Sequence, residues 1–135
     1  MAKLYLREPG SEELQEATLG RRDLMVSDLA VTEVTSALAR HCRERTLTTE
    51  AAESIYRKVR EHLTGGTFVR LELDSETHEH AERLLLAGSM PLRAGDALHL
   101  ALAIGARAGA VVTFDIRLAR AARQAGIAAL PAPES

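Results

Sequence analysis

The chain has 135 residues, of which 46% are hydrophobic and 27% charged, and its formal net charge is −2. These values fit one ordered domain that buries a core, and they exclude a protein that binds nucleic acid through an overall positive charge. One cysteine, Cys42, excludes an internal disulfide, and four aromatic residues are too few for a base-stacking surface.

Short apolar runs alternate with amphipathic stretches along the chain. After a turn and a helix start at Ser11, the pattern predicts a strand at 24–27, helices at 28–45 and 48–63, and a strand at 67–73. It then predicts a helix at 75–87, a helix that contains Asp96 and ends near 108, a strand at 109–114, a helix at 115–126 and a last strand at 127–133. No segment approaches the length of a membrane span, and no apolar leader is visible, so we expect a cytoplasmic protein.

Most of the predicted strands are apolar on both faces, and helices separate them. This arrangement is typical of an α/β fold in which a parallel sheet is flanked by helices. In such sheets ligands bind beyond the carboxyl ends of the strands. Candidate functional residues are therefore sought where strands end and helices begin.

Three acids meet this condition. Glu33 borders the apolar face of the helix after the first predicted strand, Asp96 opens an otherwise apolar helix, and Asp115 follows a strand directly. Between residues 83 and 133, Asp96 and Asp115 are the only acids in the sequence. Each also has a simpler interpretation: Glu33 as a solvated helix residue, Asp96 as a first-turn charge and Asp115 as a helix N-cap.

Converging carboxylates repel one another unless a cation lies between them. An all-oxygen set of ligands suits Mg²⁺ or Mn²⁺, which activate water and stabilise the charge that develops on a phosphodiester. If the three acids converge, they predict such a metal site, with nearby arginines binding phosphate.

The segments "VSDLAVTEVTSALAR", "LRAGDALHLALA" and "VVTFDIRLARAARQAGI" together resemble the PIN-domain ribonucleases, most closely the VapC-type toxins of toxin–antitoxin pairs. The resemblance implies that Glu33, Asp96 and Asp115 are the catalytic, metal-binding acids and that the fold is the three-layer PIN fold. It also implies Mg²⁺ or Mn²⁺ as cofactor, RNA as substrate, a small antitoxin as partner and a homodimer.

The family also has a first strand that ends in an Asp, ahead of a segment that "KLYLREPGSEEL" resembles. That strand and that Asp have no counterpart here, so we expect a single domain, 1–135, with a gap in the sheet. A longer reading frame is one explanation. A short form closed by direct strand pairing, or by a second chain, is the other.

Several other residues are open to two interpretations. His99 is either a metal ligand beside Asp96 or a partly buried, locally bonded helix residue, and the His78–His80 run is expected on a solvated face. Ser27 and Thr113 could orient ligands through their hydroxyls. Cys42 is expected to be a small core residue. The regularly spaced arginines of the last helix are either solvated or bind RNA, and they are Arg117, Arg120 and Arg123.

Two functions remain open at this point. The first is a metal-dependent endoribonuclease of the toxin type, with cleavage weakened by the absent acid. The second is a catalytically degenerate PIN domain that binds an antitoxin or another subunit. A phospho-acceptor signalling domain is set aside, because the acid pair that such domains need after their first strand is not present.

Overall fold

The computed structural model describes residues 4–7, 24–64, 69–113 and 115–130. At its centre is a parallel sheet of five strands in the order β3-β2-β1-β4-β5. The strands are β1 (Leu4–Leu6), β2 (Leu24–Ser27), β3 (Val69–Leu71), β4 (Ala110–Val112) and β5 (Ala128–Leu130). All five strands run in the same direction, so their carboxyl ends share one edge of the sheet.

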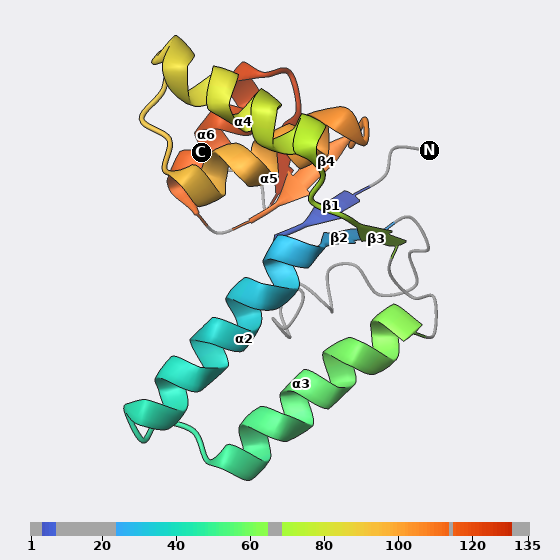
Figure 1. Cartoon of the computed structure of the whole chain (residues 1–135), viewed down its shortest axis with the longest axis vertical. Helices are drawn as coiled ribbons and strands as arrows, with labels where there is room; N and C mark the ends of the chain where they lie inside the picture. The colour runs from blue at the N-terminus through green and yellow to red at the C-terminus, as the bar shows by residue number, and fades with distance from the viewer. Residues whose placement is uncertain (1–3, 8–23, 65–68, 114, 131–135) are drawn as a thin grey trace.

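Helices cover both faces of this sheet. Figure 1 shows α4, α5 and α6 gathered on one side, while α2 and α3 extend from the other side as two long rods. Within the described ranges no helix is long and apolar enough to cross a membrane. The helices are α2 (Asp28–Arg43), α3 (Thr49–Thr64), α4 (Ser75–Ala87), α5 (Ala94–Gly105) and α6 (Ile116–Gln124).

Alternate side chains of each strand enter opposite layers of the core, as the pleat of a strand requires. Tyr5, Met25 and Val111 pack with residues of α5 and α6, in one cluster. Leu6 and Val26, whose side chains point the other way, belong to a second cluster that includes residues of α2. The three middle strands, β2, β1 and β4, are therefore buried on both faces, whereas the edge strands β3 and β5 are partly exposed.

The predicted α/β class, with a parallel sheet flanked by helices, is confirmed. The predicted helix at 75–87 has the bounds of α4, and the strand predicted at 24–27 has those of β2. The strand predicted at 67–73 is shorter, since β3 comprises Val69–Leu71 within the described residues. The helix start at Ser11 lies outside the described residues.

The gap expected in the sheet is not found, and this part of the expectation is corrected. Strand β1 (Leu4–Leu6) lies in the central position and pairs in parallel with β2 on one side and β4 on the other. All three of its residues are buried. Three apolar residues are enough to fill the place between two strands whose backbone groups would otherwise remain unpaired.

Candidate functional site

The candidate site lies at the carboxyl edge of the sheet, where β2, β1 and β4 end side by side. Leu6 is in register with Val26 and with Val112, so Arg7 follows β1 at the level of Ser27 and Thr113. The backbone nitrogen of Arg7 donates to the carbonyl oxygen of Val112 at 3.1 Å. The Arg7 side chain therefore starts from the middle of this edge.

Glu33 reaches the same edge from α2. That helix begins directly after β2, because the hydroxyl of Ser27 caps it by accepting from the backbone nitrogen of Ala30 at 2.9 Å. Ser27 thus orients the helix that carries Glu33. The Glu33 side chain is one-third exposed, and both of its oxygens face cationic or donor groups: Oε1 is bonded to Nε2 of His99, and Oε2 lies 3.6 Å from Nη2 of Arg7.

These partners determine the charge state of Glu33. Partial burial raises the pKa of the Glu33 carboxyl, but its hydrogen bond and electrostatic interaction with His99, and the positive charge of Arg7, have the opposite effect. The pKa of Glu33 therefore lies below its ordinary value even though the Asp115 carboxylate raises it. Glu33 is an anion held by two basic side chains.

His99 connects this carboxylate to the core. Its ring is fully buried, and Nδ1 lies 2.6 Å from the phenol oxygen of Tyr5, which is also fully buried. The two rings meet edge to face, with centroids 5.6 Å apart. Burial raises the pKa of Tyr5 far above its ordinary value, and this outweighs the lowering effect of its hydrogen bond to Ser27. Tyr5 is therefore a neutral phenol at the end of a polar chain that leads to Glu33.

Asp96 lies in the first turn of α5 and is 4% exposed. Its Oδ2 accepts from the backbone nitrogen of Arg93 at 3.2 Å, as in a capping box. The preceding residue, Gly95, is the point of approach to Glu33: a Cβ at this position would lie 3.4 Å from Oε2 of Glu33. The start of α5 and the Glu33 carboxylate are thus direct neighbours.

Asp115 is the N-cap of α6. Its Oδ1 accepts from the backbone nitrogens of Arg117 and Leu118, at 2.9 and 3.3 Å. Its own backbone nitrogen donates to the hydroxyl of Thr113 at 3.0 Å, so Thr113 orients the backbone of the acid. Asp115 thus lies just beyond the end of β4, and its charge raises the pKa of Glu33.

The three predicted acids thus come from three different elements: Glu33 from α2, Asp96 from the start of α5 beside Glu33, and Asp115 from the cap of α6. Their chemistry fits Mg²⁺ or Mn²⁺, since Mg²⁺ is commonly bound by one or two carboxylates together with water and substrate phosphate. In the described part of the chain, however, no group of three or more His, Cys, Asp or Glu side chains is arranged to hold a metal ion. Glu33 faces His99 and Arg7 instead.

Sequence reasoning missed two features of the site. Arg7 was not a candidate, because no local pattern marks a single arginine after three apolar residues. His99 is buried as one interpretation expected, but its partners are not local: Tyr5 and Glu33 are 94 and 66 positions away.

Cys42 was expected in the core and is only half-buried, near the end of α2, where its thiol contacts the carbonyl of Thr48.

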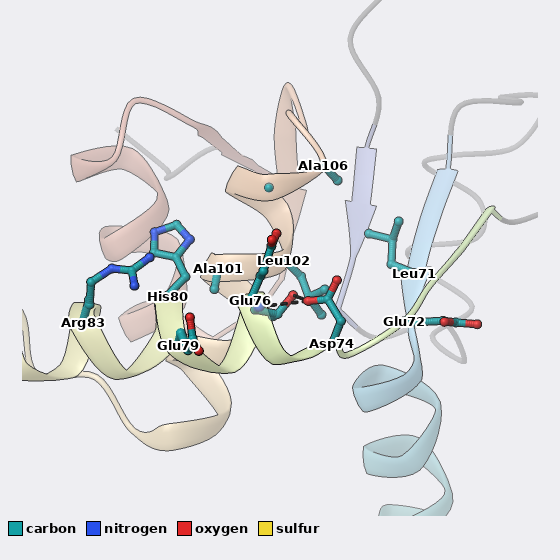
Figure 2. A pocket seen from close by; sticks show the side chains of 12 residues that line it. Leu71, Glu72, Asp74, Glu76, Glu79, His80, Arg83, Ala101, Leu102 and Ala106 are labelled. Carbon is teal, nitrogen blue, oxygen red and sulfur yellow. Dashed lines mark hydrogen bonds between the residues drawn. The ribbon is translucent and has the colours of Figure 1, made fainter.

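The remaining predicted residues lie outside this cluster. His78 is exposed and His80 is half-buried on α4, while the three arginines of α6 are exposed as expected. His80 lines a pocket of about 540 Å³ between α4 and α5. Figure 2 shows His80 and Arg83 toward one end of this pocket and Asp74 and Glu72 toward the other. None of the three candidate acids lines it.

Comparison with known proteins identifies the family. The PIN-domain model matches residues 2–124, and the chain belongs to the PIN-domain family. No curated protein matches the chain significantly.

Solved structures agree with this assignment at the level of the fold. VapC20 of Mycobacterium tuberculosis, a toxin that cleaves the sarcin-ricin loop, is 14% identical, with a TM-score of 0.67 over 88% of this chain and 95% of that one. PAE2754 of Pyrobaculum aerophilum is 20% identical, with a TM-score of 0.68 over 96% and 84%. VapBC2 of Rickettsia felis, bound to a DNA fragment from its promoter, is 13% identical, with a TM-score of 0.60 over 93% and 96%. The neighbours therefore include toxin–antitoxin proteins of the VapC type.

Proposed function

We propose that this chain is the toxin of a toxin–antitoxin pair and a metal-dependent endoribonuclease. The observation that carries the proposal is the close approach of Glu33 to the start of α5, the helix that contains Asp96, in a PIN-type fold. Glu33 lies against Gly95 at the start of the helix that contains Asp96, and the charge of Asp115 acts on Glu33. Membership of a family with VapC-type structural neighbours supports a nuclease function.

In this proposal Asp96 and Asp115 hold Mg²⁺ or Mn²⁺, and Glu33 is the third acid. The cation, when bound, supplies an activated water and stabilises the charge on the phosphodiester. His99 orients Glu33 through its ring nitrogen, and Tyr5 fixes the His99 ring. The exposed arginines of α6, beginning at Arg117, follow Asp115 and would contact the phosphate backbone of RNA.

A small antitoxin is the proposed protein partner, and a homodimer is the proposed assembly. The toxin–antitoxin complexes among the structural neighbours support the antitoxin. Copurification of the chain with the product of an adjacent small gene, followed by measurement of the mass of the complex, tests both statements.

A second candidate function is partner binding without cleavage. One observation favours it: both oxygens of Glu33 already face basic groups of the chain, His99 and Arg7. This candidate predicts antitoxin binding that survives the loss of charge at Asp96 or Asp115, with no RNA turnover at any metal concentration.

The test is RNA cleavage by the purified chain with Mg²⁺, with Mn²⁺ and with EDTA. We expect slow cleavage that requires the metal and disappears in Asp96→Asn, where the amide oxygen can still accept from the backbone nitrogen of Arg93. Asp74→Asn is the matched control, because Asp74 is also a helix-start aspartate but is exposed and caps α4. Cleavage that is equal in Asp96→Asn and the parent would indicate a contaminating nuclease. Absence of cleavage alongside antitoxin binding would favour the second candidate.

A further inference from the structure

Arg7 follows the central strand of the sheet, and its positive charge lies beside Glu33, one of the acids proposed to bind a metal ion. We propose that Arg7 is a built-in counter-cation of Glu33, and that a divalent ion gains Glu33 as a ligand only by displacing the Arg7 guanidinium. The inference rests on the proposed function, because it concerns the same three acids. It adds a residue that opposes metal binding at this site.

The position of Arg7 follows from the sheet. Strand β1 is paired on both sides, and the first residue after it is Arg7. The backbone nitrogen of Arg7 donates a hydrogen bond to the carbonyl oxygen of Val112. The side chain therefore starts between the end of β2, which leads to Glu33, and the end of β4, which leads to Asp115. It is only 19% exposed, so its charge is largely withdrawn from solvent and from screening by salt.

Arg7 is well suited to this role because its charge is permanent. A guanidinium stays protonated at all pH values that proteins tolerate, whereas a histidine can lose its proton. Glu33 consequently has a positive partner 3.6 Å from Oε2 whatever the protonation state of His99. The same partner lowers the pKa of Glu33 while Asp115 raises it, so Arg7 offsets the repulsion between the two acids.

The positive charge of Arg7 lowers the affinity of this site for a divalent ion. A divalent ion at Oε2 of Glu33 would lie close to the guanidinium, and like charges a few ångströms apart in a partly buried site repel each other. Metal binding must therefore move Arg7 away from Glu33 or leave Glu33 out of the coordination shell. In either case the Arg7 charge weakens the site for divalent ions.

Calorimetric titration of Mn²⁺ into the full chain, without RNA, tests the inference. We expect Arg7→Met to bind Mn²⁺ about tenfold more tightly than the parent, or more, since about 1.4 kcal/mol of relieved repulsion corresponds to that factor. Arg7→Lys keeps the charge and should behave like the parent. Arg70→Met is the matched control, because Arg70 also pairs with an acid, Asp28, but at an exposed position on β3.

Two further variants make the result specific. Adding Glu33→Gln to Arg7→Met should remove the gain in affinity, because the carboxylate that Arg7 releases is then absent. Arg7→Gln keeps a polar side chain and replaces Arg7→Met if circular dichroism shows that the latter is unfolded. Mn²⁺ affinity that is unchanged or lower in a folded, uncharged Arg7 variant overturns the inference.

The inference and the proposed function can fail separately. Tighter Mn²⁺ binding in Arg7→Met with no RNA cleavage in any variant would support the counter-cation role and refute the nuclease. Cleavage that depends on Asp96, combined with unchanged Mn²⁺ affinity in Arg7→Met, would support the nuclease and refute the role of Arg7.

Discussion

The phenol oxygen of Tyr5 and Nδ1 of His99 lie 2.6 Å apart, and both side chains are fully buried. This hydrogen bond joins the central strand of the sheet to α5, and on the far side of the ring His99 contacts Glu33. The orientation of the candidate acid therefore depends on a residue in the core.

Tyr5→Phe removes one partner of that bond and leaves a buried ring nitrogen unsatisfied. We expect the free energy of unfolding to fall by about 1–3 kcal/mol, the usual cost of such a group. Urea unfolding followed by circular dichroism measures this, and the slope with denaturant should stay constant. Tyr56→Phe is the control, because Tyr56 is 42% exposed and its hydroxyl group has no such environment. Equal stability of Tyr5→Phe and the parent would contradict the prediction.

The raised pKa of Tyr5 also predicts a loss of stability at alkaline pH. Its pKa is raised in the folded state, so the unfolded chain releases the phenol proton first, near the ordinary value of 10.0. The stability contributed by Tyr5 is complete below pH 10.0 and is lost as the pH rises above it. The free energy of unfolding, measured across this range, should decline more steeply in the parent than in Tyr5→Phe. Parallel curves would show that Tyr5 ionises normally in the folded chain.

The lowered pKa of Glu33 predicts a loss of stability at acid pH. Its pKa is lowered in the folded state, so its contribution to stability is complete above the ordinary value of 4.5 and is lost as the pH falls toward the lowered value. Glu33→Gln should remove this part of the acid-induced decline. Because the side chain is one-third exposed, we expect a modest effect, which unfolding curves at several pH values below neutrality can resolve. If the free energy of unfolding of Glu33→Gln declines at acid pH as steeply as that of the parent, other acids cause the decline.

The observed role of Asp115 as a helix cap and its proposed role as a metal ligand can be tested separately. As the N-cap of α6 it stabilises the helix, and Asp115→Ala should cost about 0.5–2 kcal/mol. Asparagine caps about as well as aspartate, so Asp115→Asn should keep the stability while it removes the charge. If Asp115 is a metal ligand, Mn²⁺ affinity falls in both variants, whereas thermal stability falls only in the alanine variant. Retained Mn²⁺ affinity in Asp115→Asn would leave the cap as the only role.

Much of the fold could be predicted because the signals are local. The apolar run of β2 and the cap-to-glycine stretch of α4, from Asp74 to Gly88, carry their boundaries in neighbouring residues. The general place of the acids followed from the rule that functional groups gather beyond the carboxyl ends of parallel strands. The identity of Glu33, Asp96 and Asp115 as metal ligands remains a prediction.

The centre of the sheet could not be predicted in the same way. Leu4–Leu6 is too short for its periodicity to distinguish a strand from a helix, and the resemblance assigned it to the segment after the first strand. Its position is decided by two neighbours that are distant in sequence. The same holds for Arg7 and for Tyr5, whose contacts with Glu33 and His99 exist only once the sheet and α5 are assembled.

The pairing of β1 with β4 has a consequence for synthesis of the chain. Leu4 is in register with Ala110, a separation of 106 positions (110 − 4), so the middle of the sheet joins two segments that are far apart in the chain. During translation β1 can pair with β2 once both have been made, but its other edge stays open until β4 has left the ribosome. A nascent chain of this protein therefore exposes an unpaired apolar strand edge from the synthesis of β1 until that of β4, a state that can misassociate or recruit a chaperone.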